Sequence, residues 1–406
     1  MMFSINFTPF NLKNLMIAFE EALNIVLSSA TPLNSEKVTL NLSLNRILVQ
    51  DLFSDMDMPP FDKSAVDGFA CRKVDLGAPL TVIEVIRAGK VPENTVGESQ
   101  CSGIMTGAMV PEGADTVIMV EDTDEISADQ IRFVGTKTAA NICHKAEDIH
   151  KGDKVLNKGT LIHASQIAVL ASVGCVEPLV YRQPVVAILS TGDELVEPEY
   201  IPEPSQIRNS NAAQLTAQIT AMNAIPLYLG IVPDDEEQTR KAIEQALAAA
   251  DVVLLTGGVS MGDFDFVPMI LKEQKVEILF NRIAVQPGKP TVFGHRDGKY
   301  VFGLPGNPVS SFVQFEMLVK PLLYALGDHA YRPIQLKLPL AVDYMRRNNQ
   351  RRAFVPVTFL QPEGVVPIAY HGSAHIHAYV AAEGIMSVPI GISHLKKGEL
   401  VDVRSL

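Results

Sequence analysis

The feature that most constrains the fold is an alternation of apolar runs and amphipathic segments that begins near residue 184. The runs are VVAILS, IPLYLGIV, DVVLLT and VEILFNRIAV, and segments near 211–223 and 235–249 carry apolar residues at helical spacing. Buried strands that alternate with helices are typical of a parallel sheet with helices on both faces. We expect Asp234 to cap the second helix, because a carboxylate accepts from free N–H groups at a helix start.

Loops rich in glycine and short polar side chains follow these strands. They comprise Thr191–Glu194, Thr256–Gly262 with its continuation to Asp265, and Leu304–Ser310. In open parallel sheets, ligands bind beyond the carboxyl ends of the strands. Glycine lets backbone N–H groups approach a phosphate, and a following helix adds the positive end of its dipole. Tight turns are the simpler interpretation of one such loop, but three together predict a cradle for a phosphorylated anion.

Carboxylates in the same loops need a separate explanation, since Asp193, Glu194, Asp263 and Asp265 would repel a phosphate. Mg²⁺ would resolve the conflict, because it binds one or two carboxylates together with phosphate oxygens. Helix caps or solvated charges are the alternative for any one of them. Positive charge follows in the segment from Arg282 to Lys289, where Lys289 stands between glycine and proline on stiff backbone.

The chain carries further β-rich segments on both sides of this pattern. Short apolar runs broken by proline and glycine between residues 55 and 142 predict an inserted β-rich domain, with a hairpin at Pro111–Gly113. Strand patterns alone return after residue 329 and predict a C-terminal all-β domain. Short polar side chains beside turn residues form a second candidate site in the inserted domain: Asp62, Ser64, Asp67 and Thr106.

Two helices are expected outside the α/β pattern, over 12–30 and from about His163 to Gly174, with Ser165 as a cap. We expect them to pack together in a helical linker unit. No apolar run reaches the roughly 20 residues that cross a bilayer, so a membrane partner is not expected. A net charge of -12 has the wrong sign for attraction to nucleic acid, so a nucleic-acid partner is not expected. The four cysteines lack the paired spacing of a zinc or redox motif, which fits a protein of the reducing cytoplasm.

Seven motifs in this order make the chain similar to a known family. They are PPFDKSAVDGFA, IMTGAMVPEGADTVIMVED, AEDI, LSTGDEL, TGGVSMGDFDF, PGKP and GLPGNPVSSF. This set resembles the MoeA family of molybdopterin molybdenumtransferases, which also includes the gephyrin E domain. The resemblance implies insertion of molybdate into the dithiolene of adenylylated molybdopterin, with release of AMP and help from Mg²⁺. It also implies a homodimer, with a cleft formed between the sheet domain of one subunit and the β domain of the other, and a molybdopterin-adenylyl donor protein.

The resemblance assigns an α/β multidomain fold, with a central parallel α/β domain of the MoaB/MogA type. The expected domains are a helical linker domain (1–54 with 143–182), a β-rich inserted domain (55–142), an α/β molybdopterin-binding domain (183–328) and a C-terminal β-barrel-like domain (329–406). The catalytic candidates by motif match are Asp67, Thr106, Asp148, Glu194, Asp234 and Asp265, with Glu194 and Asp265 also as metal ligands. The cofactor-binding candidates are Thr191, Gly192, Asp193, Gly257, Gly258, Ser260, Gly262, Lys289, Pro305, Gly306, Asn307 and Ser310. The molybdate candidates are Arg282, Gln286, Arg351 and Ser373.

Departures from the family pattern fall on the segments expected to hold molybdate. Arg282 and Gln286 stand where the family usually has two lysines, and the loss of one cation at Gln286 weakens attraction for a dianion. His375 and His377 replace smaller polar residues after the Gly372-Ser373 turn. A non-catalytic or divergent paralogue that binds molybdopterin or the finished cofactor without efficient insertion, and a gephyrin-like scaffold, therefore remain alternatives. Neither the choice between molybdate and tungstate nor the role of each carboxylate follows from the sequence.

Overall fold

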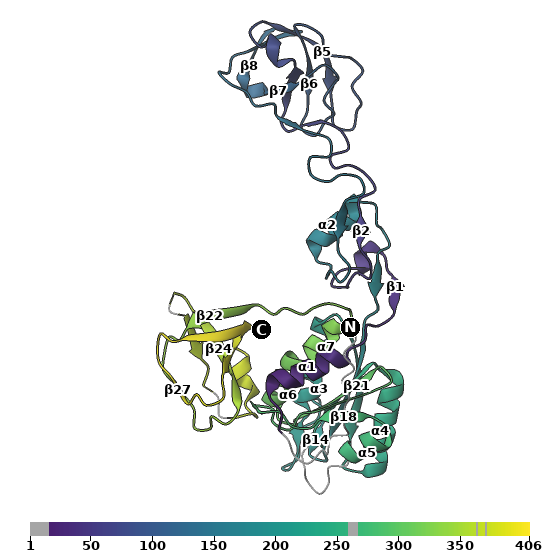
Figure 1. Cartoon of the computed structure of the whole chain (residues 1–406), viewed down its shortest axis with the longest axis vertical. Helices are drawn as coiled ribbons and strands as arrows, with labels where there is room; N and C mark the ends of the chain where they lie inside the picture. Colours follow the sequence, from purple (N-terminus) through teal and green to yellow (C-terminus); the bar gives the residue numbers. More distant parts are fainter. Residues whose placement is uncertain (1–15, 259–266, 363, 370–371) are drawn as a thin grey trace, which may run out of the picture.

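The computed structural model describes residues 16–258, 267–362, 364–369 and 372–406. Figure 1 shows an elongated molecule in which a β-rich domain stands at the end of a narrow linker unit, away from the α/β domain and the C-terminal β domain. From residue 16 the chain runs along the α/β domain, passes out through the linker unit and returns through it. Within these residues, no helix combines the length and apolar character needed to cross a membrane.

The α/β domain is built on a six-stranded sheet. In spatial order its strands are β16 (Ile225–Val232), β13 (Val185–Thr191), β17 (Val252–Thr256), β21 (Lys299–Leu304), β20 (Val292–Arg296) and β18 (Glu277–Phe280). The first four strands run in parallel, which confirms the expected centre of the sheet. At one edge the structure adds β20, which pairs antiparallel with both β21 and β18, because the tight turn at Asp297 and Gly298 that joins it to β21 leaves no room for a crossover helix.

Helices cover both faces of this sheet, as predicted. Along β13, Val186 and Ile188 enter one core, while Ala187 and Leu189 enter the other, as the alternation of a strand requires. Burial of Ile188 or Leu189 contributes about 1.5–3 kcal/mol each. The first face is covered by α1 (Phe19–Ser29), α3 (Ser210–Ala221), α6 (Pro308–Gln314), the π-helical turn η4 (Phe315–Val319) and α7 (Lys320–Ala325). The second face is covered by α4 (Glu236–Ala249) and α5 (Val267–Glu273).

The cap of α4 differs from the predicted one by a single residue. Asp235, not Asp234, occupies the N-cap position, and its side chain accepts from the N–H of Gln238 at 2.8 Å. Two consecutive aspartates satisfy the same sequence rule, and only the backbone geometry decides between them. Asp234 is thereby left for the loop at the carboxyl edge of the sheet.

The two helices expected to pack together lie in different units. Helix α1 buries Ala22 and Val26 in the core of the α/β domain and contacts α7, so the packing predicted between the helices is wrong. The reason is that α1 precedes the linker unit in the chain and packs its apolar face on the α/β domain, which offers a larger apolar surface. Helix α2 (Ala164–Ser172) packs on the short helix η1 (Leu40–Leu42), and its cap is His163 rather than Ser165.

The linker unit holds two passes of the chain together by short ladders. Strand β1 (Ser35–Lys37) pairs with β12 (Leu179–Tyr181), and β2 (Leu52–Phe53) pairs with β11 (Lys154–Leu156). Its small core includes Leu48, Ile162, Leu170 and Val180. The outgoing and returning passes are thus paired with one another, and the orientation of this unit determines the position of the β-rich domain.

The β-rich domain contains its own six-stranded sheet. Its strands in spatial order are β7 (Thr116–Met119), β4 (Gly68–Cys71), β6 (Gln100–Ile104), β5 (Leu80–Ile86), β9 (Gln130–Phe133) and β8 (Thr123–Ser127). Shorter elements complete it: β3 (Lys63–Ser64), η2 (Lys73–Asp75), η3 (Val120–Asp122) and β10 (Ile142–Cys143). The turn at Pro111–Gly113 does not form the predicted hairpin, because β6 and β7 both pair with β4 and not with each other.

The C-terminal domain takes one of its strands from elsewhere in the chain. Its sheet has the order β19 (Val285–Gln286), β24 (Arg352–Leu360), β26 (Gly384–Val388), β28 (Leu400–Ser405) and β22 (Gln335–Pro339), and β25 (Gly364–Pro367) pairs with β24. The remaining short elements are β14 (Leu195–Val196), β15 (Ile207–Arg208), β23 (Tyr344–Met345), η5 (Ile376–Tyr379) and β27 (His394–Leu395). Strand β19 belongs to the α/β part of the sequence, yet Val285 pairs with Arg352 and Gln286 with Ala353. The run VEILFNRIAV is therefore split between two sheets.

Candidate functional site

A cleft of about 290 Å³ lies between the α/β domain and the C-terminal domain. We call it the interdomain cleft; its lining residues are Gln286, Pro287, Gly288, Lys289, Pro290, Pro305, Asn307, Ser310, Arg351, Gly372 and Ser373. Separate segments of sequence meet there: the end of β19 with the turn that follows it, the loop after β21, the residue before β24 and the Gly372-Ser373 turn. The predicted site residues that the structure brings together here are Gln286, Lys289, Pro305, Asn307, Ser310, Arg351 and Ser373.

The loop that carries Lys289 is held from beneath by a buried amide. Gln314, which is fully buried on α6, donates from Nε2 to the carbonyl of Pro287 at 3.1 Å. Gly288 has φ +103°, and a Cβ there would lie 2.2 Å from the same nitrogen, so glycine is required at this close approach. The backbone below Lys289 is therefore rigid, while the lysine itself is exposed to the cleft.

On the opposite side of the cleft, the Gly372-Ser373 turn is hydrogen-bonded to the loop after β21. Asn307 donates from Nδ2 to Ser373 Oγ at 2.8 Å, and the N–H of Val309 donates to the Ser373 carbonyl at 3.0 Å. Arg351 donates to the carbonyl of Val285 at 3.2 Å, which fixes its guanidinium beside β19. Two cations, Lys289 and Arg351, thus share one cleft with hydroxyl and amide donors, which is a setting for an oxyanion.

Arg282, the fourth molybdate candidate, is not among the residues that line this cleft. It lies on the connection between β18 and β19, where its carbonyl accepts from the N–H of Ile17 at 3.3 Å. The sequence spacing placed it near Gln286, but the backbone turns between the two positions because β19 leaves for another sheet.

A second group of predicted residues lies at the carboxyl edge of the parallel strands. We call Thr191, Gly192, Gly257, Gly258 and Gly306 the strand-end cradle. Gly257 has φ +94°, and a Cβ there would lie 2.4 Å from the Thr191 carbonyl. The hydroxyl of Thr191 is buried and has no hydrogen-bond partner among the described residues, although it lies 2.8 Å from where a Cβ on Gly258 would stand. Buried polar atoms are rarely left unpaired, so this hydroxyl is a candidate donor to a ligand atom.

Asn211, at the start of α3, joins two of these loops and was missed by the sequence analysis. Its Nδ2 donates to Thr256 Oγ1 at 2.7 Å and to the Gly306 carbonyl at 2.8 Å. Its Oδ1 is buried without a partner in the described part of the chain. An asparagine in the first turn of a helix resembles an ordinary cap, so no sequence signal separates it from Asn209, which is the actual N-cap.

The carboxylates beside the cradle are partly committed to the backbone. Asp193 accepts from the N–H of Asp234 at 3.1 Å. Glu194 bends back over Gly192, where a Cβ would lie 2.3 Å from its Oε2. Among the residues the structure describes, no group of three or more His, Cys, Asp or Glu side chains is arranged to hold a metal. The predicted residues Ser260, Gly262 and Asp265 lie outside the described residues.

Asp67 and Thr106 form a compact pair in the β-rich domain. Gly68 faces Ile104 across β4 and β6, which brings the residues that flank these strands together. Asp67 Oδ1 accepts from the Thr106 N–H at 2.7 Å and from its hydroxyl at 3.0 Å, and these bonds lower the pKa of Asp67 below its ordinary value. Asp148 lies apart on an exposed turn, where its N–H donates to the Met58 carbonyl.

Figure 1 shows that the linker unit separates the β-rich domain from the α/β domain. One chain therefore does not bring Asp67 and Thr106 to the strand-end cradle or to the interdomain cleft. Only a second molecule could supply both groups to one site.

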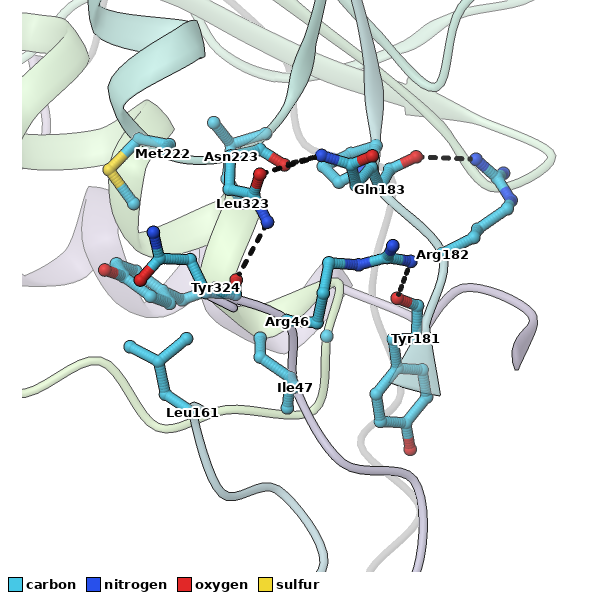
Figure 2. Close-up of a pocket in the computed structure, with 13 residues that line it drawn as sticks. Arg46, Ile47, Leu161, Tyr181, Arg182, Gln183, Met222, Asn223, Leu323 and Tyr324 are labelled. Atoms are coloured by element: carbon cyan, nitrogen blue, oxygen red, sulfur yellow. Dashed lines mark hydrogen bonds between the residues drawn. The ribbon is translucent and has the colours of Figure 1, made fainter. Parts of the chain in front are cut away.

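A further pocket lies where the linker unit meets the α/β domain (Figure 2). Its volume of about 40 Å³ leaves room for water but not for a nucleotide or pterin. The two guanidinium groups that line it are paired, Arg46 with Glu36 and Arg182 with Asp251. This pocket is part of a joint between domains.

Comparisons with known proteins agree over almost the whole chain. Residues 17–174 match the family model "MoeA N-terminal region (domain I and II)", 187–325 match "Probable molybdopterin binding domain", and 337–406 match "MoeA C-terminal region (domain IV)". The molybdopterin molybdenumtransferase of Staphylococcus epidermidis is 37% identical over 401 residues, which cover 96% of each chain. That of Staphylococcus aureus is 38% identical and covers 95% of each chain. Two crystal structures of a molybdopterin biosynthesis MoeA protein from Pyrococcus horikoshii are also similar. One is 33% identical with a TM-score of 0.79 and covers 96% of this chain and 99% of its own; the other is 29% identical with a TM-score of 0.83 and covers 97% and 100%.

Proposed function

The chain belongs to the MoeA family, whose members act as transferases in molybdenum cofactor biosynthesis, and we propose that it inserts molybdate into the dithiolene of adenylylated molybdopterin and releases AMP. The observation that carries the proposal is the interdomain cleft, where candidate residues from separated segments line one space. A non-catalytic paralogue or a scaffold is not favoured, because relatives matched over nearly their full length are named transferases.

Molybdate fits the interdomain cleft by charge and by hydrogen bonding. Lys289 and Arg351 supply positive charge in a protein whose net charge is -12, so attraction for a dianion depends on these local cations. Ser373 presents a hydroxyl whose oxygen already accepts from Asn307, which leaves its own proton free to be donated to an oxyanion. Gln286 contributes an amide in place of a third charge.

The phosphate groups of adenylylated molybdopterin fit the strand-end cradle. Backbone N–H groups at Gly257 and Gly258 can approach an anion without a Cβ between them, and the buried Thr191 hydroxyl supplies one further donor. Asn211 holds two of the loops at a fixed separation. The cradle and the cleft share the loop of Pro305–Ser310, so a single ligand can extend from one to the other.

Mg²⁺ is compatible with this arrangement through Glu194. No hydrogen bond or ion pair engages its carboxylate among the described residues, and Mg²⁺ needs only one or two carboxylates when phosphate oxygens complete its shell. When bound, the ion would neutralise charge on the phosphoanhydride that releases AMP. Asp265, the second expected ligand, lies outside the described residues.

We infer a homodimer in which the β-rich domain of one subunit completes the cleft of the other. Asp67 and Thr106 would then act beside the strand-end cradle of the second copy, together with Asp148 and Asp234. Because hydrogen bonds from Thr106 lower the pKa of Asp67, this carboxylate stays ionised at neutral pH and acts there as a negative charge and a hydrogen-bond acceptor.

The substrate would come from a molybdopterin-adenylyl donor protein, because an adenylylated dithiolene has to be made before metal insertion. The reaction is assigned to the cytoplasm, where reducing conditions preserve thiols such as the four free cysteines of this chain.

The test is AMP release from adenylylated molybdopterin by the purified protein with Mg²⁺, with molybdate titrated from micromolar to millimolar concentration. We expect release that depends on molybdate and saturates. Tight binding of the nucleotide without molybdate-dependent release would contradict the transferase and leave the binding protein.

A further inference from the structure

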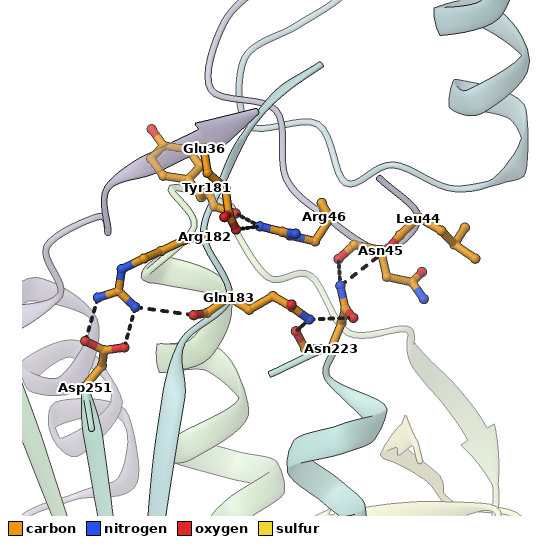
Figure 3. Close-up of polar contacts among 9 residues, drawn as sticks. All are labelled: Glu36, Leu44, Asn45, Arg46, Tyr181, Arg182, Gln183, Asn223 and Asp251. Atoms are coloured by element: carbon orange, nitrogen blue, oxygen red, sulfur yellow. Dashed lines mark hydrogen bonds and ion pairs between the residues drawn. The ribbon is translucent and has the colours of Figure 1, made fainter. Parts of the chain in front are cut away.

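The linker unit meets the α/β domain through two passes of the chain, which pair as β1 and β12. Two short strands alone would let the linker unit bend on the α/β domain. Polar contacts beside these strands remove that freedom, and Figure 3 shows most of them. They form three separate anchors, each on a different element of the α/β domain.

The first anchor is a two-pronged ion pair at the base of the sheet. Arg182, directly after β12, donates from Nη1 and Nη2 to the two carboxylate oxygens of Asp251, both at 2.7 Å. Asp251 precedes β17, is buried, and also accepts from the N–H of Val185 at 2.9 Å. A planar guanidinium bound to both oxygens fixes direction as well as distance.

The second anchor is an amide after the last residue of α3. Asn223 donates from Nδ2 to the carbonyl of Asn45 at 3.1 Å and more weakly to that of Leu44, both in the linker unit. The side chain of Gln183 donates back to Asn223, to its Oδ1 at 2.9 Å and to its carbonyl at 2.8 Å. One asparagine therefore ties the outgoing pass of the chain to the returning one (Figure 3).

The third anchor is a carboxylate after α7. Asp328 Oδ2 accepts from Lys158 Nζ at 2.8 Å and from the Tyr181 hydroxyl at 3.2 Å, so it engages the returning pass of the linker unit at two points. Next to it, a Cβ on Gly327 would lie 2.3 Å from Ile47 Cδ1, so the linker unit packs directly on this turn.

Three residues of the joint share an uncommon backbone conformation. Asn45, Asn223 and Asp328 all have positive φ, at 59°, 55° and 55°. Non-glycine residues adopt this region rarely and at some cost, unless the surrounding contacts hold them there. Three anchors on three elements also define a plane, so they restrain both the bending and the twisting of the linker unit on the α/β domain.

We propose that this three-point joint is a positioning device for the reaction: it aims the β-rich domain so that Asp67 and Thr106 reach the cleft of the second subunit. The inference rests on the proposed cross-subunit site. The linker unit carries the β-rich domain and is itself held at the joint, so the joint sets the direction in which this part of the chain leaves the α/β domain (Figure 1). Arg182, Asn223 and Asp328 are thus positioning residues, although each lies outside the site.

The test uses mixed dimers with one competent site. One subunit carries Glu194→Ala and keeps its arm, meaning its linker unit and β-rich domain; the other carries Asp67→Ala and keeps its cleft. The joint variant is Asn223→Gly with Asp328→Gly, because glycine keeps positive φ and removes only the anchoring side chains. The matched control is Lys275→Gly with Asp297→Gly, which are exposed residues of the same domain with φ 59° and 49°.

We expect the joint variant to lower kcat for AMP release at least tenfold when it is placed in the subunit that supplies the arm, because displacements near 1 Å cost up to about a hundredfold. In the subunit that supplies the cleft it should leave kcat within about twofold, and the KM for molybdate should not change in either case. The control should be silent in both. A purely structural role would reduce activity equally in both placements, and that result would overturn the inference.

Two further outcomes are informative. If the mixed dimer without joint substitutions is no more active than its two parent homodimers, the cross-subunit site is wrong and this inference fails with it. If the double variant does not assemble, each single substitution is measured in the same way.

Spin labels at Val74→Cys in the β-rich domain and Met269→Cys in the α/β domain, in a background with Cys143→Ser and Cys175→Ser, give the second readout. The joint variant should broaden their distance distribution, and an unchanged distribution would contradict the proposed rigidity.

Discussion

Gln286→Lys tests whether molybdate occupies the interdomain cleft. Gln286 is half-buried, lines the cleft with Lys289 and Arg351, and has its backbone paired to Ala353 in the C-terminal sheet. A lysine there adds one positive charge without moving the strand that carries it. If the cleft holds a dianion, its affinity for the protein should rise and the KM for molybdate should fall.

The size of the effect follows from the charges. An ammonium about 5 Å from a dianion gains about 1.7 kcal/mol in a water-like dielectric. Screening at 0.15 M ionic strength, where the Debye length is about 8 Å, leaves about 0.9 kcal/mol, or about a fivefold lower KM. At about 1 M salt the same calculation leaves less than a twofold effect. The gain should therefore be visible at low salt and nearly vanish at high salt.

The assay is the rate of AMP release as a function of molybdate concentration, at both ionic strengths, with kcat and KM fitted separately. Gln335→Lys is the matched control, because Gln335 is exposed on β22 and does not line the cleft. Equal effects of the two substitutions would refute the reasoning, since they would reflect net charge alone. An unchanged KM for Gln286→Lys would place the oxyanion elsewhere.

Three other predictions concern the cradle and the joint. Thr191→Val should leave the urea midpoint unchanged or raised, because the buried hydroxyl has no hydrogen-bond partner in the described part of the chain, while calorimetry should show about tenfold weaker binding of adenylylated molybdopterin. Gly257→Ala should destabilise the protein by about 1–3 kcal/mol in the same urea assay, whereas Gly298→Ala, also at positive φ but in open space, should cost less. Burial alone would raise the pKa of Asp251, but bonds from Arg182 and Val185 outweigh it and hold the pKa below 3.8. Because the folded pKa is the lower one, this contact stabilises the fold above about pH 4 and loses its effect as the pH falls through the lowered value; the urea midpoints of wild type and Arg182→Gln should converge between pH 6 and pH 3.

Much of the fold follows from local periodicity. The alternation of apolar runs predicts β13, β16 and β17, and the helical spacing predicts α3 and α4. Long-range contacts are not encoded locally. The predicted packing of α1 against the second helix was therefore wrong, and the order of strands in the β-rich domain was not predicted. The sequence pattern of a strand does not reveal which sheet that strand joins.

The candidate site shows the same division. Glycines and charges at strand ends predict the cradle, because the carboxyl ends of parallel strands share one edge. Asn211 and Gln314 could not be predicted, since their partners are backbone carbonyls and a hydroxyl far away in the sequence. Arg282 stands four residues before Gln286 yet lies outside the cleft, because sequence proximity says nothing about a backbone turn between two sheets.

Strand β19 has a consequence for how this chain can be recombined with its relatives. A chimera cut near residue 329, where the chain order ends the α/β domain, would pair a foreign β24 with the native Val285–Gln286 edge and would mix the two walls of the cleft. A donor C-terminal domain would need to bring its own counterpart of residues 285–290 as a second, discontinuous fragment. The unit that evolution can exchange intact is therefore defined by hydrogen bonding across the sheet and consists of two pieces of sequence.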